Sequence, residues 1–156
     1  MTGHLRPSPD ALALIKRHEG LRLSAYQDPG GVWTIGWGHT GDVNPSHAIT
    51  EHQANALLAL DAQVAAAAIN RLVTVPLRQY QFDALVSFVF NLGEGRFATS
   101  TLLKRINKGN FTGAGAEFLR WTKGRHNGRK ITLGGLVKRR DEERLLFLGR
   151  AGHGLV

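Results

Sequence analysis

The chain contains no cysteine among its 156 residues. This absence excludes disulfides, thiolate nucleophiles and zinc sites built on cysteine ligands. A long hydrophobic run is also missing, because the most apolar stretch, residues 56–69, is short and is interrupted by Asp61 and Gln63. The first ten residues (MTGHLRPSPD) hold two prolines and no apolar segment. We therefore expect no signal peptide and a soluble protein that is made in the cytoplasm.

Acidic residues are scarce relative to basic ones. The chain has 12 Asp and Glu against 20 Lys and Arg, which gives a formal net charge of +8. Such a charge favours an acidic partner, and composition leaves open whether that partner is nucleic acid, an anionic membrane surface or an anionic polymer. Residues 120–150 hold ten Lys or Arg against three acids. A solvated surface explains this basic region as well as attraction to anionic wall or outer-membrane polymers does.

The remaining composition is that of one folded domain. Apolar residues make up 42% of the chain and charged residues 21%, which is enough for a core and argues against disorder. The seven histidines show no metal-binding spacing, since the nearest candidates, His47 and His52, span a helix start. We expect neither a metal nor a cofactor.

Local signals place the first elements. Ser8 and Pro9 begin a helix that stops at Gly20. Two β-prone segments, residues 21–26 and 32–37, flank a Gly-rich turn and predict a hairpin. A capping box at residues 50–53 begins a long helix. Its expected apolar stripe consists of Ala54, Leu57, Leu58, Val64, Ala65, Ala68, Ile69 and Leu72.

Beyond Pro76 the pattern predicts helices and one loop. Helices are expected over residues 77–91, 101–107, 114–121 and 136–148, with a polar loop at 123–130. The fold class is therefore α+β. A small N-terminal lobe with a β-hairpin (roughly residues 1–50) is joined by the long helix to an all-helical C-terminal lobe (51–156), within one domain. A cleft between two such lobes is a natural substrate site.

Two carboxylates lie in contrasting surroundings. Glu19 ends a helix, where the helix dipole and partial burial disfavour a further negative charge and favour the protonated acid. Asp28 lies in a Gly-rich turn, where amides and water favour the ionised form. Thr34 presents a hydroxyl on the strand face opposite Trp33 and Ile35, which suits sharing a water with Asp28. Taken singly, each residue has an ordinary explanation as a surface acid, a turn former or a strand threonine.

Taken together, these residues resemble a known triad. Glu19, Asp28 and Thr34 have the Glu-x8-Asp-x5-Thr spacing of the phage-type lysozymes, glycoside hydrolase family 24. The flanking segments 19–23 (EGLRL) and 34–39 (TIGWGH) are similar to that family too, as are 90–93 (FNLG), 100–103 (STLL) and 135–142 (GLVKRRDE). The resemblance covers residues 8–148 and implies a lysozyme-like fold.

The resemblance also implies roles. Glu19 would be the general acid, and Asp28 with Thr34 would hold and activate the attacking water. The substrate would be bacterial peptidoglycan, cleaved with inversion at the β-1,4 bond between N-acetylmuramic acid and N-acetylglucosamine, by an endolysin that ends the phage cycle. The protein is expected to be a monomer that binds no nucleic acid and that leaves the host cytoplasm through a separate holin-type pore.

Three further positions match residues that contact the glycan in the family. These are Thr40, Phe90 and Thr101. Simple core packing remains an equal explanation for Phe90, and Thr40 departs from the apolar residue often found at its position. The resemblance also places Asp61 opposite the loop that carries His39. We therefore expect a structural His39–Asp61 ion pair, with a solvated Asp61 as the alternative.

Two other functions compete with hydrolysis. A lytic transglycosylase would form an anhydro product without water, and Asp28 with Thr34 argues against it because that chemistry has no water to position. A basic nucleic-acid-binding protein would explain the charge but not the triad.

Overall fold

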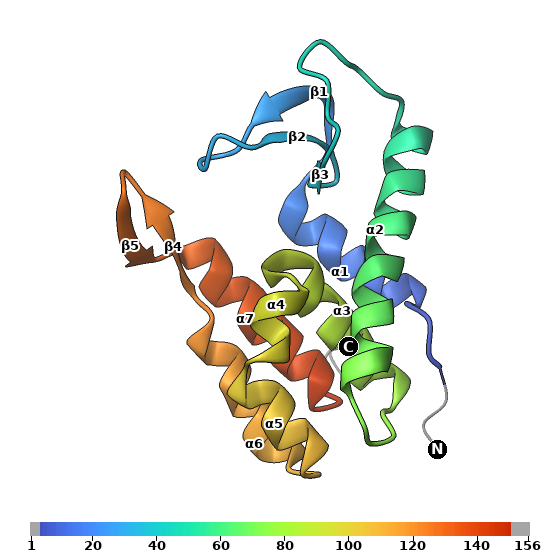
Figure 1. Ribbon diagram of the computed structural model, residues 1–156, viewed down its shortest axis with the longest axis vertical. Helices are drawn as coiled ribbons and strands as arrows, with labels where there is room; N and C mark the ends of the chain where they lie inside the picture. Colours follow the sequence, from blue (N-terminus) through green and yellow to red (C-terminus); the bar gives the residue numbers. More distant parts are fainter. Residues whose placement is uncertain (1–3, 151–156) are drawn as a thin grey trace.

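The computed structural model describes residues 4–150, and Figure 1 shows a small sheet at one end of a group of helices. The first part of the described chain contains α1 (Pro9–Glu19), β1 (Arg22–Gln27), β2 (Trp33–Gly36), β3 (His39–Thr40) and α2 (Glu51–Leu72). The second part contains α3 (Gln79–Leu92), α4 (Glu94–Ala98), α5 (Thr101–Asn107), α6 (Phe111–Glu117), a 3-10 turn (Phe118–Arg120), β4 (Lys123–His126), β5 (Arg129–Thr132) and α7 (Gly134–Phe147). The expected α+β class is confirmed, and α2 links the sheet to the other helices (Figure 1).

The sheet forms where the hairpin was predicted. β1 and β2 pair antiparallel around the turn at residues 28–31, and the short strand β3 pairs with the other edge of β2. The register of β1 against β2 shifts between Arg22 and Tyr26. Such a shift bends the ribbon, and here it lies between the end of α1 and the turn that carries Asp28.

Helix α2 begins with the predicted capping box. The Thr50 hydroxyl accepts a hydrogen bond from the Gln53 amide at 3.1 Å, and the Gln53 side chain accepts one from the Thr50 amide at 2.9 Å. The expected stripe was wrong at Val64, whose residue is 71% exposed. Small residues at positions 62 and 66 face inward instead, so α2 packs closely on α3 and turns Val64 to the surface.

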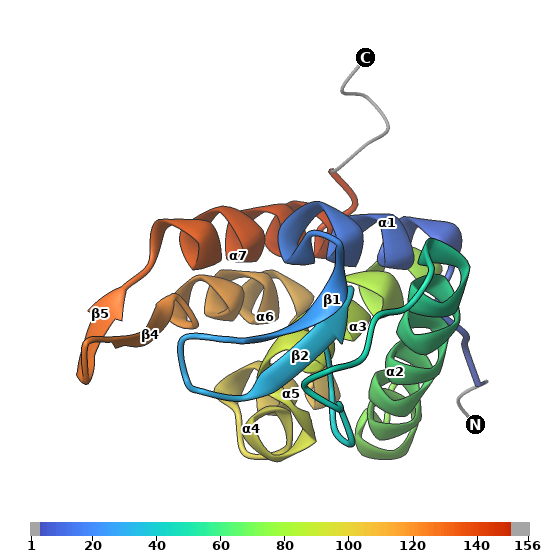
Figure 2. The same cartoon turned by 90° about the horizontal axis from the view of Figure 1, so that it is seen from above.

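The core is centred on α3. Every residue from Phe82 to Val89 is buried, and α3 contacts α1, α2 and α7. Ala11 and Ile15 of α1 belong to the same buried cluster as these helices. The helical core therefore includes a helix from the N-terminal lobe and does not begin at the lobe boundary expected near residue 50. In Figure 2, α1 and α7 lie along the same edge of the molecule, where side chains of the two helices meet.

The C-terminal lobe is not all-helical, which corrects the sequence prediction. The expected polar loop at residues 123–130 is part of a hairpin in which β4 and β5 pair antiparallel. Asn127 and Gly128 form its turn with φ angles of 51° and 78°. Two successive positive φ values are the requirement of a type I′ turn, which Asn-Gly meets well. This dipeptide was the signal that the polar composition concealed.

Candidate active site

Glu19 is the last residue of α1, and its carboxylate lies against the backbone of Gly38. Gly20, with φ of 72°, ends the helix by donating its N–H to the Lys16 carbonyl at 3.2 Å. A Cβ built on Gly38, whose φ is 79°, would lie 2.5 Å from Oε1 of Glu19. Only glycine therefore fits beside this carboxylate without displacing it. Sequence reasoning included Gly38 in a motif but did not identify this requirement.

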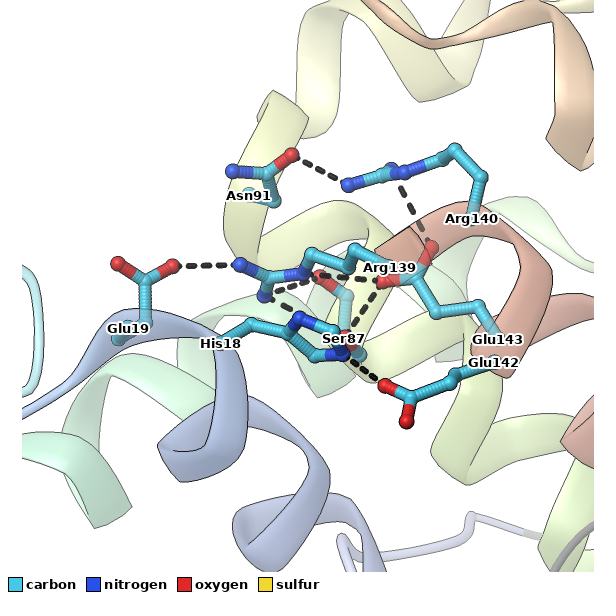
Figure 3. A network of polar contacts seen from close by, with 8 residues as sticks. All are labelled: His18, Glu19, Ser87, Asn91, Arg139, Arg140, Glu142 and Glu143. Atoms are coloured by element: carbon cyan, nitrogen blue, oxygen red, sulfur yellow. Dashed lines mark hydrogen bonds and ion pairs between the residues drawn. The ribbon is translucent and has the colours of Figure 1, made fainter. Parts of the chain in front are cut away.

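A guanidinium from the far end of the chain holds the other oxygen of Glu19. Nη1 of Arg139, on α7, lies 2.7 Å from Oε2 (Figure 3). The Glu19 side chain is 20% exposed and that of Arg139 is buried. The sequence predicted surroundings that only disfavour negative charge on Glu19, and this prediction was wrong because a cation 120 residues away contacts the carboxylate.

Asp28 is held by its own turn, as the sequence predicted. Its Oδ1 accepts hydrogen bonds from the amides of Gly30 and Val32, both at 2.8 Å. Its own amide donates to the Val32 carbonyl at 2.9 Å. Two amide donors on one carboxylate oxygen fix the orientation of the Asp28 side chain. Both donors go to Oδ1, so they leave Oδ2 for another donor such as water.

Thr34 meets Asp28 at the same peptide group. The buried Thr34 hydroxyl donates to the Val32 carbonyl at 2.9 Å, and this carbonyl also accepts from the Asp28 amide. Thr34 lies in the middle strand of the sheet, opposite Tyr26 on one side and Thr40 on the other. The structure thus joins Asp28 and Thr34 through Val32, while Glu19 is held separately by other elements.

The predicted ion pair between His39 and Asp61 is confirmed. Nδ1 of His39 lies 2.7 Å from Oδ2 of Asp61, with 21% and 28% of the two side chains exposed. His39 belongs to β3 and Asp61 to α2, so the pair ties the sheet to the long helix. The structural role expected for this pair stays a prediction, since Asp61 also lines the cavity described next.

A cavity of about 240 Å³ opens beside Gly38. It is lined by Gly38, Thr40, Asp61, Val64, Ala65, Val89, Phe90, Gly93 and Glu94. Thr40 and Phe90, which the sequence predicted to contact glycan, therefore face one space, which they share with Gly38 but not with Glu19, Asp28 or Thr34. Phe90 is half-buried and packs on the core, which confirms the packing explanation, while its contact with glycan stays a prediction.

Thr101 does not line this cavity. It lies in a second one, of about 650 Å³, between the β4–β5 hairpin and the helices that follow α3. The lining residues are Leu92, Arg96, Thr101, Glu117, Arg120, Trp121, Lys123, Gly124, Arg125 and Lys130. Glu117 is its single acid, and Glu117 already pairs with Arg105 and Arg120. The second cavity therefore has a strong positive charge.

The described part of the chain lacks two other kinds of feature. Between residues 4 and 150, no three His, Cys, Asp or Glu side chains are grouped as metal ligands. Over the same residues, no helix has both the length and the apolar character needed to cross a membrane. The groups present at the candidate site are two carboxylates, a hydroxyl and a guanidinium.

The fold and this site define a lysozyme-like glycoside hydrolase. Residues 16–143 match the phage lysozyme family model, and the chain belongs to this family. It is 50% identical over 140 residues to the endolysin of Acyrthosiphon pisum secondary endosymbiont phage 1, which covers 90% of this chain and 96% of that protein.

Solved structures show the same architecture. The endolysin from Escherichia coli O157:H7 phage FAHEc1 superposes with a TM-score of 0.87 at 39% identity, over 95% of this chain and 96% of that one. The muramidase domain of SpmX from Asticaccaulis excentricus superposes with a TM-score of 0.85 at 43% identity, over 92% and 97%. The lysozyme-like fold expected from the sequence is confirmed.

Proposed function

We propose that the chain is an endolysin that hydrolyses the β-1,4 bond between N-acetylmuramic acid and N-acetylglucosamine in bacterial peptidoglycan, and so lyses the host cell at the end of a phage cycle. Glu19 is the general acid, and Asp28 and Thr34 position the water. One observation carries this proposal. The Thr34 hydroxyl and the Asp28 amide share the Val32 carbonyl, whereas different residues, Gly38 and Arg139, contact Glu19.

The chemistry follows from the different contacts that hold the two carboxylates. Glu19 donates its proton to the glycosidic oxygen as the bond from the sugar carbon to that oxygen breaks. A water held by Oδ2 of Asp28 and the Thr34 hydroxyl attacks the same carbon from the other face, and Asp28 accepts its proton. A carboxylate that binds a water in this way acts as a general base, and the reaction inverts the configuration in one step.

The first cavity supplies a place for the glycan. Phe90 gives an apolar face and Thr40 a hydroxyl in a space that is also lined by Gly38, the residue against which Glu19 lies. An aromatic face and a few polar groups are the usual contacts of a sugar site. We assign Thr101 to a more distant contact, because it lines the second cavity.

The positive second cavity supports binding of an anionic polymer of the wall or outer membrane. Arg96, Lys123, Arg125 and Lys130 line it, and Trp121 adds an aromatic wall. Such a surface attracts polyanions over distances of about 10 Å at moderate salt. We propose that the hairpin increases the residence of the enzyme on its substrate.

Two further proposals concern the protein in the cell. We expect it to act as a monomer and to reach the wall from the host cytoplasm through a separate holin-type pore. Expression in bacteria with and without a co-expressed pore-former tests the second point. Lysis of the culture without the pore-former would contradict it.

The deciding experiment compares wild type with Glu19→Gln on purified peptidoglycan. The variant keeps the size of the side chain but has no proton to donate, so we expect a loss of about 10³-fold or more. Mass spectrometry of the wild-type fragments should show hydrolysed reducing ends. Anhydro ends would instead indicate a transglycosylase, and no fragmentation with retention of nucleic acid would favour the binding protein.

A further inference from the structure

Behind Glu19 lies a buried group of charged residues, which we name the α7 cluster: Arg139, Arg140 and Glu143 of α7, with Ser87 of α3. Figure 3 shows that Arg139 lies between Glu19 on one side and Glu143 on the other. The arginine thus connects a partly exposed carboxylate, Glu19, with one that is completely enclosed, since Glu143 is 0% exposed.

Glu143 contacts both guanidiniums of the cluster. Its Oε2 accepts a hydrogen bond from the Ser87 hydroxyl at 2.5 Å and one from Nε of Arg139 at 3.3 Å. Its Oε1 lies 3.3 Å from Nη1 of Arg140, an ion contact that does not have hydrogen-bonding geometry. One carboxylate therefore faces two cations, and hydrogen bonds fix its position chiefly against Arg139.

Further hydrogen bonds leave Arg139 little freedom. Its Nη2 donates to the carbonyl and the hydroxyl of Ser87, both at 3.3 Å, while Nη1 points to Glu19. With Nε on Glu143, each nitrogen of the guanidinium has an acceptor. The direction in which Nη1 points is thus set from behind, by Glu143 and Ser87.

The formal charges of this group cancel when both carboxylates are ionised. Arg139 and Arg140 are the cations, and Glu19 and Glu143 are the anions. Burial lowers the pKa of Arg140 to about 10, against the opposing effect of the negative charges of Glu143 and Glu19. Burial likewise raises the pKa of Glu143, and the charges of Arg140 and Arg139 oppose this rise. Charge on any one member thus acts on the others.

We infer that Glu143 is a positioning residue for the reaction: it aims Arg139 at Glu19 and offsets the positive charge that Arg139 and Arg140 place behind the acid. The inference rests on the proposed role of Glu19. A general acid must carry a proton before it can donate one, and a nearby cation disfavours the protonated form. Without Glu143, the contact of Arg139 and the nearby charge of Arg140 would together disfavour protonation of Glu19, whereas Glu143 offsets part of that positive charge.

Other charged groups surround Glu19 and remain the same in the experiment below. On α1, the neighbouring His18 contacts Glu142 of α7. Burial lowers the pKa of His18, Glu142 opposes this effect, and the positive charges of Arg139 and Arg17 add to it. Asp28 is the remaining carboxylate of the proposed site and lies in the β1–β2 turn. None of these groups replaces the contact of Glu143 with both arginines.

Opposite charge changes inside the cluster test the inference. Glu143→Gln keeps acceptors for Ser87 and Arg139 but adds one positive charge. The fall of kcat/KM at alkaline pH should move to lower pH by about one unit. When each protein is scaled to its own maximum, the activity of the variant at neutral pH should then be about tenfold lower than that of wild type. Arg140→Met removes a positive charge, so its alkaline fall should move to higher pH.

The double variant Arg140→Met/Glu143→Gln has balanced charges again. Its activity at neutral pH, scaled to its own maximum, should return to within about twofold of wild type. A loss of packing would not produce this recovery. Asp141→Asn is the matched control, because it removes one negative charge from the same helix at a half-exposed position paired with Arg144. Its alkaline fall should not move.

Carbon-13 NMR of the Glu19 carboxyl, without substrate, gives a second measurement of the same effect. The pH at which this signal titrates should fall in Glu143→Gln, rise in Arg140→Met and recover in the double variant. If Glu143→Gln does not fold, the other two variants decide, since the double variant leaves no unpaired charge buried. Profiles and titrations that coincide with wild type overturn the inference. A wild type that cleaves no peptidoglycan overturns the proposed function instead.

Discussion

The two carboxylates of the site are held in opposite ways. Asp28 is bound by amides two and four residues further along its own turn, whereas Glu19 is bound by Arg139, 120 residues away, and enclosed by Gly38. The setting of the proposed base thus depends on local sequence, and that of the proposed acid on tertiary packing. Damage to α7 or to the β2–β3 turn should therefore affect the acid and spare the base.

After Glu19→Gln, the largest effect in this comparison is expected at Asp28. Asp28→Asn keeps an oxygen that can accept from Gly30 and Val32, so the turn should persist while the charge that activates water is lost. We expect a loss of about 10²- to 10³-fold in kcat, smaller than that of Glu19→Gln because Thr34 still contacts the water. Rates on purified peptidoglycan, with circular dichroism to verify folding, measure this. Activity near the wild-type level would make Asp28 a turn former only.

A smaller effect on activity should come from replacing Gly38, because the substitution disturbs the close contact between this residue and Glu19. In Gly38→Ala the new Cβ would lie 2.5 Å from Oε1 of Glu19, so the carboxylate must move. We expect kcat/KM to fall by about 10- to 100-fold, with a misplaced acid as the cause.

Gly109→Ala is the matched control for that variant. Gly109 has φ of 78°, nearly the value of Gly38, and a Cβ there meets no atom within 4 Å. Both variants should lose about 1–2 kcal/mol of stability through the left-handed backbone. Only Gly38→Ala should lose activity, and equal activity in the two would show that contact with Glu19 is unimportant.

The same contrast explains what the sequence could predict. The Asp28 turn, the Thr50 cap and the helix over residues 101–107 depend on residues a few positions apart, and each was predicted. The His39–Asp61 pair, although tertiary, followed from family resemblance. The features that were not predicted depend on contacts between distant segments or on signals that local periodicity does not show.

Three omissions show this. Arg139 reaches Glu19 only because α7 packs along α3, which no local pattern indicates. Val64 continues an apolar stripe, yet the alanines beside it set the buried face of α2. The β4–β5 hairpin lacks apolar alternation, and its one signal was the pair Asn127 and Gly128.

A modest effect on stability is expected from the His39–Asp61 pair, which joins the sheet to α2. Both side chains are partly exposed, so water screens the interaction. We expect Asp61→Asn to cost about 1 kcal/mol, and a double-mutant cycle with His39→Gln to show a coupling free energy of the same size. Chemical denaturation of the four proteins measures it. A coupling free energy of zero would show that the contact between His39 and Asp61 does not stabilise the fold.

The smallest effect should come from the basic hairpin, which lies outside both carboxylate environments. Replacing Arg125, Arg129 and Lys130 with Gln should weaken binding to purified wall by a few-fold at low salt. The difference should shrink as salt rises, because screening already removes the attraction in wild type.

The control replaces three exposed cations elsewhere, Lys104, Lys108 and Arg150, with Gln. It has the same net charge as the hairpin variant, so a specific role of the hairpin predicts weaker binding for the hairpin variant alone. Sedimentation with wall fragments compares the proteins. Equal binding of wild type and the hairpin variant at low salt would identify the hairpin as an ordinary solvated surface.

The anomeric configuration of the first product tests most directly whether a separately held acid and a water-binding base act together. Carboxyl groups about 6.5–9.5 Å apart leave room for water and invert, whereas groups about 5–5.5 Å apart form a covalent intermediate and retain. Proton NMR during the first turnovers, before mutarotation, should show the α-anomer accumulating from the β-linked glycan. Initial accumulation of the β-anomer, or a glycosyl adduct trapped on Asp28, would contradict the role assigned to Asp28 and Thr34.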